Sequence, residues 1–374
     1  MLKLGSCVAI GLLVASSALA APAPKVSDDI RQFLDVVRAN FTAWDFEHKG
    51  QLTKAEIEKD MQNPAFKGDA AAALAGMKWG LEKIDPKIPT EATSTNVFTL
   101  AELDTIESTI SGGGKVINPS FFRSVQRFKT GQKIIQNQSR ALFAADSPHL
   151  AAIRQDWDSD CYFNSAIGSL AQAAPQAIVK LIKTNPDGSF TVTYPGKAAQ
   201  KIPAPTDAEI AAYTDATDGI WFNVLEKAYA NIRKVDPKKA TDEPMDAATL
   251  IGGDENFVLG LVSGHQMKVT RFPLVSNKSA DAKFLQQVRD DLSAAFREHR
   301  AVVTSKFHHA FAVVAFDPRT DTITIHNPYD GNGGEGMPSG ESDLSSGGFF
   351  SISTEKFVEN FNNMGVEQSA LAAR

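Results

Sequence analysis

The sequence predicts an α+β protein whose helices come first and whose strands gather toward the C-terminus. From residue 27 to about 111, apolar residues recur at helical spacing, as at Ile30, Leu34, Val37 and Phe41. Residues 112–146 begin with three glycines and continue as a basic and polar stretch, which is typical of a linker. From about residue 147 helical patterns return and then give way to runs of Val, Ile, Phe and Thr that favour strands.

The first residues have the pattern of a secretory signal. Lys3 supplies a positive end, residues 7–19 are apolar or small without a charge, and Ala18-Leu19-Ala20 forms a small-x-small cleavage site. The apolar run is shorter than the roughly 20 residues that span a bilayer. We therefore expect a signal peptide over residues 1–20, a secreted or periplasmic destination, and no membrane association of the mature chain.

The composition is that of an ordinary globular protein. Of 374 residues, 43% are hydrophobic and 22% are charged, which is enough apolar material for one large core or two smaller ones. The net charge is −6 and Lys and Arg form no basic block, so nothing favours nucleic acid as a partner. The sequence does not indicate an oligomeric state.

The helical domain predicted over residues 25–111 contains a loop, DFEHKGQLTKAE, with the spacing of an EF-hand. Such loops place oxygen ligands, a glycine and an apolar residue at fixed positions, and here Gly50 and Leu52 occupy the glycine and apolar positions. Four side chains stand at ligand positions and are the candidate calcium ligands: Asp45, Glu47, Thr53 and Glu56.

Two features weaken the prediction of bound calcium. Lys49 puts a cation where a ligand is needed, and the second loop, over residues 91–102, has Asn96 at the glycine position while keeping Phe98, Thr99 and Glu102. The sequence therefore predicts a degenerate EF-hand-like pair, with a metal-free helical pair as the alternative.

Cys161 raises the main question about function. The only other cysteine, Cys7, lies in the predicted signal peptide, so the mature chain would hold one thiol and no internal disulfide. A single thiol in an exported protein suggests a reactive group or an intermolecular pair, and a buried core cysteine is the alternative. Ser159 and Asp160 are good N-cap residues before an amphipathic stripe, so the thiol is predicted in the first turn of a helix, where the dipole favours a thiolate.

A base for this thiol is predicted in the segment KFHHAFAVVAFDPRTDTITIHNP, residues 306–328. An apolar run, a turn around Arg319 and an alternating run together indicate a β-hairpin. Folding the hairpin brings His309 opposite the region of Asn327. The Asn327 side chain would then orient the His309 imidazole, as an Asn does in a thiol hydrolase. Their neighbours His308 and His326 are interpreted as bystanders.

Gln155, six residues before the cysteine, completes the candidate site. Its side-chain amide could form an oxyanion hole together with the backbone N–H of Cys161.

Several segments in the second half of the chain resemble calpains, the papain-like cysteine endopeptidases. The matches are collinear from about residue 155 to 361, and their order is more specific than any one of them. They are QDWDSDCYFNSAIGSL at 155–170, GIWFNVLEKAYA at 219–230, Leu250 with Gly252-Gly253, His309-Ala310-Phe311, Asn327-Pro328-Tyr329, and Gly348-Phe349-Phe350 followed by Phe357.

The resemblance implies a papain-like two-lobed peptidase domain over residues 147–374, with a helical lobe carrying the cysteine and a β-rich lobe carrying His and Asn. It implies Cys161 as nucleophile, His309 as general base and acid, Asn327 as its orienting partner and Gln155 as oxyanion donor. The chain departs from the family where Tyr162 replaces a Trp, as Tyr329 does after Asn-Pro, and where Ser159 replaces a Gly.

The sequence thus predicts an exported calpain-like cysteine endopeptidase that acts on proteins or peptides and needs no cofactor for its chemistry. Calcium is expected only at the EF-hand-like loop, and the dependence of activity on calcium stays open. The alternatives are a catalytically inactive binding protein with this fold and a Cys-His acyl or amide transferase.

Overall fold

The structure, a computed structural model, describes residues 28–81, 97–112, 119–144, 148–155, 160–212, 215–235, 252–273, 281–306, 309–328 and 348–368. The predicted signal peptide lies outside the described residues, as do parts of the predicted linker and residues 91–96 of the second EF-hand-like loop. Four residues singled out in the sequence also lie outside them: Ser159, Leu250, His308 and Tyr329.

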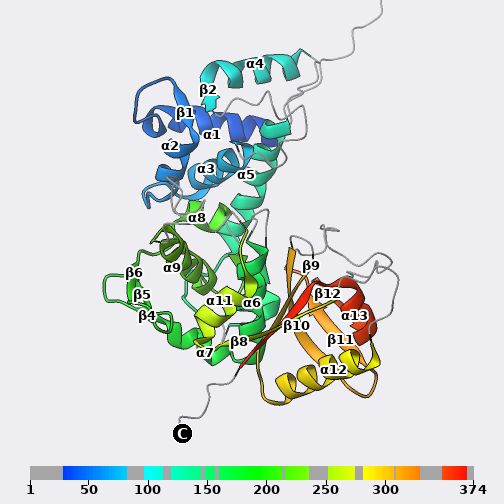
Figure 1. The fold of residues 1–374 in the computed structure, drawn as a ribbon. Helices are drawn as coiled ribbons and strands as arrows, with labels where there is room; N and C mark the ends of the chain where they lie inside the picture. Colours follow the sequence, from blue (N-terminus) through cyan, green and yellow to red (C-terminus); the bar gives the residue numbers. More distant parts are fainter. Residues whose placement is uncertain are drawn as a thin grey trace, which may run out of the picture.

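The described chain is a mixture of helices and strands, which confirms the α+β class. Figure 1 shows a helical N-terminal part at the top, a second group of helices below it, and a β-sheet at the C-terminal end. The N-terminal elements are α1 (Asp28–Trp44), β1 (Gln51–Thr53), α2 (Lys54–Met61), α3 (Gly68–Leu81), β2 (Val97–Thr99), α4 (Leu100–Ser111) and α5 (Pro119–Asn137).

The two EF-hand-like loops meet in a short antiparallel ribbon formed by β1 and β2. In this ribbon Leu52 pairs with Phe98, the apolar residue that the sequence placed at the same position of each loop. Each strand leads into a helix through a threonine and a glutamate three residues later, an arrangement that satisfies the first backbone N–H groups of the helix. In α2 these residues are Thr53 and Glu56, which form a capping box. The paired geometry predicted for the two loops is therefore present in the residues described.

The second group of elements surrounds the helix that carries the cysteine. Its short strands form a two-stranded ladder of β3 with β7 and a three-stranded sheet of β4, β5 and β6. The elements are η1 (Leu150–Ala152), β3 (Ile153–Arg154), α6 (Cys161–Ala173), α7 (Pro175–Leu181), β4 (Ile182–Thr184), β5 (Phe190–Val192), β6 (Gln200–Ile202), α8 (Asp207–Ala212), β7 (Asp215–Ala216), α9 (Trp221–Val235) and α11 (Glu255–Ser263).

The C-terminal sheet has six strands in the order β12-β11-β10-β9-β13-β8, and each neighbouring pair is antiparallel. Two helices, α12 and α13, accompany it. The elements are β8 (Met267–Arg271), α12 (Ala282–Arg297), β9 (Val302–Lys306), β10 (His309–Asp317), β11 (Thr322–His326), β12 (Phe349–Ser353), α13 (Thr354–Asn360) and β13 (Asn363–Glu367).

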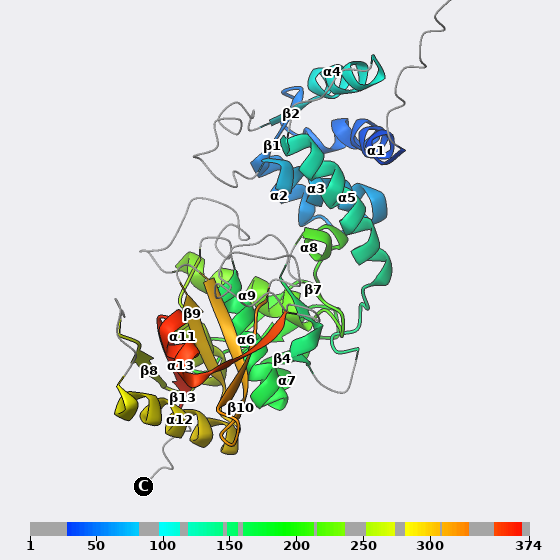
Figure 2. The same ribbon diagram turned by 90° about the vertical axis from the view of Figure 1, so that its right-hand side faces the viewer.

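The sheet separates two hydrophobic cores because successive side chains of a strand point to opposite faces. Ala310 packs with the core of α6, α9 and α11, whereas the next residue, Phe311, packs with α12 and α13. The two views agree in placing α6 beside β10 (Figures 1 and 2). At the next strand a serine joins the same helix to the sheet, since the Ser169 hydroxyl donates to the Val302 carbonyl at 2.9 Å and accepts from the Val302 N–H at 2.8 Å.

A third core fills the N-terminal part and includes one helix from later in the chain. Ala208, Ala211 and Ala212 of α8 pack among the buried residues of α3 and α5. The indole N–H of Trp79 donates to the Ala212 carbonyl at 3.0 Å. Helix α8 therefore ties the EF-hand-like pair to the part that carries the cysteine. No helix within the described ranges is long and apolar enough to cross a membrane.

Candidate active site

Cys161 is the first residue of α6, as the sequence predicts. Asp160 is the N-cap, and its backbone carbonyl accepts the N–H of Phe163 at 2.8 Å and of Asn164 at 3.1 Å. The apolar side of α6 then buries Phe163 and Ala166 in the core. The helix start therefore fixes the thiol at the end of α6 that lies beside the sheet, with only 7% of its surface exposed.

The thiol lies against the first residues of β10. The backbone N–H of Ala310 hydrogen-bonds to the sulfur, which puts Cys161 next to the residue that follows His309. The pKa of the Cys161 thiol is raised to about 12, mainly by burial and to a smaller extent by the nearby carboxylates of Asp160 and Glu255, whereas the N–H groups of Ala310 and Tyr162 lower it. In this arrangement the sulfur keeps its proton at neutral pH, so the expected effect of the helix dipole is outweighed by burial.

His309 and Asn327 meet at the open end of the β10–β11 hairpin. Nε2 of His309 lies 2.8 Å from Oδ1 of Asn327, and both residues are buried. The strands pair in antiparallel register with Ala312 opposite His326, and a β-bulge follows Val313. Because Asn Oδ1 can only accept a hydrogen bond, we assign the ring proton to Nε2, which leaves Nδ1 as the basic nitrogen. The hairpin geometry predicted from sequence is confirmed.

Gln155 is joined to the same hairpin through its backbone. Its N–H donates to the Pro328 carbonyl at 3.0 Å, one residue beyond Asn327, and the residue is 5% exposed. The backbone N–H of Asn327 in turn donates to the Gly348 carbonyl at 2.8 Å. The four predicted residues thus come together where the start of α6 meets the ends of β10 and β11.

His326, interpreted as a bystander, is buried beside this junction. Its ring packs on Phe349 with centroids 4.6 Å apart. Burial lowers the pKa of His326 to about 4. The imidazole is therefore neutral at neutral pH.

Arg233 is a buried residue near the cysteine that the sequence analysis did not single out. Its Nη1 donates to the Tyr162 hydroxyl at 2.6 Å and to the Gly252 carbonyl at 3.0 Å. One signal could have found it. Arg233 follows Tyr229 by one helical turn on α9, so a charged residue stands on the apolar stripe of that helix.

The predicted calcium ligands hold the first EF-hand-like loop in shape. The carboxylate of Asp45 accepts the backbone N–H of Lys49 at 2.9 Å and of Gly50 at 2.7 Å. Glu56 accepts the hydroxyl of Thr53 at 2.8 Å and its N–H at 2.9 Å. Gly50 has φ +71°, the left-handed conformation that the tight turn of such a loop requires.

The side chains at the ligand positions suit a cation less well than the backbone geometry of the loop does. The Lys49 ammonium lies 2.5 Å from the Glu47 carboxylate, so an internal positive charge occupies one of the candidate ligands. Among the residues that the structure describes, no three His, Cys, Asp or Glu side chains are grouped to hold a metal ion. Calcium binding by Asp45, Glu47, Thr53 and Glu56 stays a prediction.

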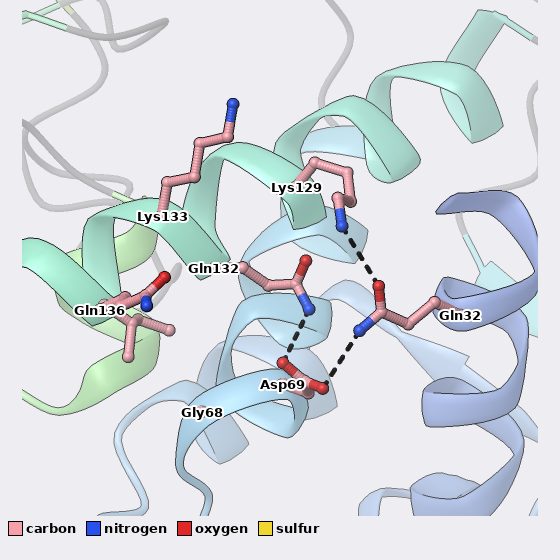
Figure 3. Close-up of a pocket in the computed structure, with 8 residues that line it drawn as sticks. Gln32, Gly68, Asp69, Lys129, Gln132, Lys133 and Gln136 are labelled. Carbon is pink, nitrogen blue, oxygen red and sulfur yellow. Dashed lines mark hydrogen bonds between the residues drawn. The ribbon is translucent and has the colours of Figure 1, made fainter. Parts of the chain in front are cut away.

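A polar pocket of about 390 Å³ lies in the N-terminal part, away from the cysteine (Figure 3). Asp69 accepts the side-chain amides of Gln132 at 2.7 Å and Gln32 at 3.3 Å, and Lys129 donates to Gln32 at 3.2 Å. Four of the residues that line it, Gln32, Asp69, Lys129 and Gln132, are thus paired with one another.

Comparisons with known proteins add no family to this description. A scan against models of protein families finds no match, and a search among curated proteins finds none either. Any function must therefore be argued from the junction of α6, β10 and β11.

Proposed function

We propose that the chain is a calpain-like cysteine endopeptidase with a papain-like two-lobed arrangement and Cys161 as its nucleophile. The observation that carries the proposal is the 2.8 Å contact between His309 Nε2 and Asn327 Oδ1 next to a cysteine at the first turn of a buried helix. An Asn on one ring nitrogen fixes the tautomer and leaves the other nitrogen to exchange a proton with the thiol.

The chemistry follows from these positions. His309 Nδ1 takes the thiol proton while the sulfur attacks a peptide carbonyl carbon, and the N–H of Cys161 with the amide of Gln155 would stabilise the oxyanion. The C–N bond then breaks, the departing amine takes the proton from His309, and a thioester remains on Cys161. Water attacks the thioester, gives one proton to His309, and releases the carboxylic acid as the proton returns to the sulfur.

The high pKa of the thiol bears on the first step. Because burial raises the pKa of Cys161 to about 12, free ionisation supplies little thiolate at neutral pH. Proton transfer to His309 must therefore accompany attack on the substrate. We further propose that the enzyme is exported, on the strength of the signal-like first 20 residues, and that its chemistry needs no cofactor.

The proposal is tested with casein as substrate and a peptidyl epoxide as thiol-directed label. The unaltered protein should release new α-amino and carboxyl groups from casein, and the label should be found on the peptide that contains Cys161. Cys161→Ala should lose both properties while keeping its thermal stability. Hydrolysis that persists in Cys161→Ala contradicts the proposal. Transfer of the acyl group to an added amine in place of water would identify a transferase.

A further inference from the structure

Strand β8 forms one edge of the C-terminal sheet in the part of the chain that the structure describes. Figure 2 shows it at the outer margin of the sheet. Its inner side pairs with β13. At one end of this pairing the Gln266 carbonyl accepts the N–H of Gln368 at 2.8 Å. At the other end the N–H of Phe272 donates to the Asn362 carbonyl at 2.9 Å.

The outer side of β8 carries a row of backbone groups that point away from β13. In an antiparallel pair, every second residue turns its N–H and C=O toward the partner strand. Gln266 and Phe272 both bond toward β13. The alternate residues between them, Met267, Val269 and Arg271, therefore turn their N–H and C=O groups outward. A row of this kind is a template for another strand.

Two exposed apolar side chains lie at this edge. Val269 is 45% exposed, and Phe257 of α11 is 48% exposed. Val269 pairs directly with Gly365 of β13, where a Cβ atom would overlap the Asn256 side chain of α11. Side chains directly opposite each other on two strands point to the same face. Val269 therefore lies on the face of the sheet that α11 covers.

Phe257 lies on the side of α11 that faces β8. It stands three residues before Gly260, so the two positions share one side of the helix. A Cβ atom at Gly260 would lie 3.5 Å from Cγ of Met267, the outward residue that precedes Val269 by two. Phe257 and Val269 thus form one apolar patch, which we call the β8 patch.

The outer edge of β8 is complementary to a second copy of itself. Two such edges that pair antiparallel about a twofold axis at Val269 place the two Val269 side chains opposite each other. Met267 of each copy then lies opposite Arg271 of the other, so no like charges meet. Lys268 points to the other face of the sheet, where its ammonium already lies 2.7 Å from the Asp291 carboxylate.

The helices of two copies would leave a space that the β8 patch can fill. Because α11 lies over β13, three strand spacings would separate the two copies of the helix, about 14 Å in all. Helices in direct contact lie about 8–10 Å apart. Large side chains must therefore project into the space, and Phe257 of each copy stands beside it. A single foreign strand would cover the backbone of β8 but would leave Phe257 exposed.

We propose that the outer edge of β8 and the β8 patch form a dimer interface, in which a second copy of this chain pairs antiparallel and makes one continuous sheet. The inference goes beyond the proposed function, since it uses none of the groups around Cys161. The paired edge is only five residues long, so the dimer should dissociate on dilution.

Sedimentation velocity at increasing protein concentration tests the proposal on the chain without its predicted signal peptide. We expect a reversible equilibrium of monomer and dimer. Val269→Lys places two ammonium groups opposite each other and should abolish the dimer, whereas Val269→Thr keeps the branched shape and should retain it. Phe257→Ala should weaken dimerisation by about tenfold, as loss of an aromatic anchor does. Phe122→Ala, at a 44% exposed position of α5, is the matched control and should change nothing.

Cross-linking locates the interface independently. The chain without its signal peptide holds one cysteine, so Cys161→Ala provides a background without thiols. Val269→Cys in this background puts one thiol of each copy beside the twofold axis, and a short bis-maleimide should join them into a covalent dimer. Ser351→Cys, at an exposed position of β12 on the opposite edge of the same sheet, is the control and should stay monomeric.

Three results would overturn the proposal. A chain that stays monomeric at every concentration contradicts it and leaves the edge to a strand of another protein. A dimer that persists in Val269→Lys uses a different surface, as does one that cross-links equally through Val269→Cys and Ser351→Cys. Thermal unfolding shows whether each variant is folded, and if Val269→Lys is not, the two cysteine variants decide.

Discussion

One set of groups fixes the position of the Cys161 sulfur, and another set raises the pKa of its thiol. The start of α6 and the N–H of Ala310 fix its position, while burial and the carboxylates of Asp160 and Glu255 raise the pKa of the thiol. Asp160 is fully buried and caps α6 through its backbone carbonyl, with no side-chain capping bond. Its carboxylate can therefore be neutralised without removing the bonds that begin the helix.

Asp160→Asn should make the thiol more reactive. Removal of the negative charge removes one cause of the raised pKa of Cys161, so the thiolate fraction at pH 8 should rise. Alkylation by iodoacetamide should accelerate by up to about tenfold, the change that accompanies one pKa unit. Asp187→Asn, an exposed carboxylate in the turn between β4 and β5, is the control. An unchanged or slower rate in Asp160→Asn would contradict the electrostatic account.

His326 should make the fold sensitive to acid. Its folded pKa of about 4 lies below the ordinary value of 6.5, so stability is full above pH 6.5 and falls as the pH drops toward 4. The loss is on the order of 3 kcal/mol. His326→Gln should not show this loss. Urea unfolding at pH 7 and pH 4 should therefore show that the free energy of unfolding of the variant rises relative to that of the wild type as the pH falls.

Asp60 also makes stability depend on pH, so the effect of His326 is measured as the difference between His326→Gln and the wild type at each pH. Burial raises the pKa of its carboxyl to about 6, which favours the folded state at low pH and opposes the effect of His326. A difference in unfolding free energy between His326→Gln and wild type that does not change with pH would show that His326 is not held neutral.

Secondary-structure elements carry the predictions that succeeded best. The hairpin of β10 and β11 could be predicted because a buried apolar run, a turn and an alternating run fix which residues face each other. Leu52 and Phe98 could be paired because EF-hand-like loops have a fixed spacing. Arg233 was missed because its partners, Tyr162 and Gly252, come from other segments, and no spacing within α9 identifies them.

The EF-hand-like loop offers a test at this scale. Lys49 replaces a ligand and pairs with Glu47, so Lys49→Asp both removes the internal cation and adds a carboxylate. We expect this variant to bind calcium at least tenfold more tightly than the wild type, which is about 1.4 kcal/mol. Isothermal titration calorimetry measures the change.

Lys59→Asp makes the same change of charge in α2, beyond the last residue of the loop, and should not gain affinity. Equal calcium affinity in Lys49→Asp and Lys59→Asp would show that the loop cannot act as a ligand set.

At the scale of the whole molecule, α8 unites the EF-hand-like pair with the part that carries the candidate site. It packs on α3 and α5, while the Lys227 ammonium of α9 lies 2.7 Å from the Glu209 carboxylate of α8. This docking could not be predicted from sequence, since a six-residue helix rich in alanine has no distinctive pattern.

Gly131 of α5 lies where α8 packs against α3 and α5. A Cβ atom there would lie 3.1 Å from the Cβ of Ala211 and 3.5 Å from that of Ala72, between three helices. Gly131→Leu should therefore lower the free energy of unfolding by roughly 1–3 kcal/mol through overpacking. Lys133→Leu, at an exposed position of the same helix, should cost much less. Thermal unfolding should remain a single transition, and two separated transitions would show that the parts are not coupled through α8.

The acyl-enzyme is the most direct measurement of the central claim. The protein is mixed with an activated ester of an N-blocked peptide, quenched in acid within the first turnover, digested, and examined by mass spectrometry. We predict one acyl group per chain on the peptide that contains Cys161, and no detectable adduct when His309→Ala is treated for the same time. An adduct on another residue, or none on the unaltered protein while the ester is hydrolysed, would contradict the assignment of Cys161 as the nucleophile.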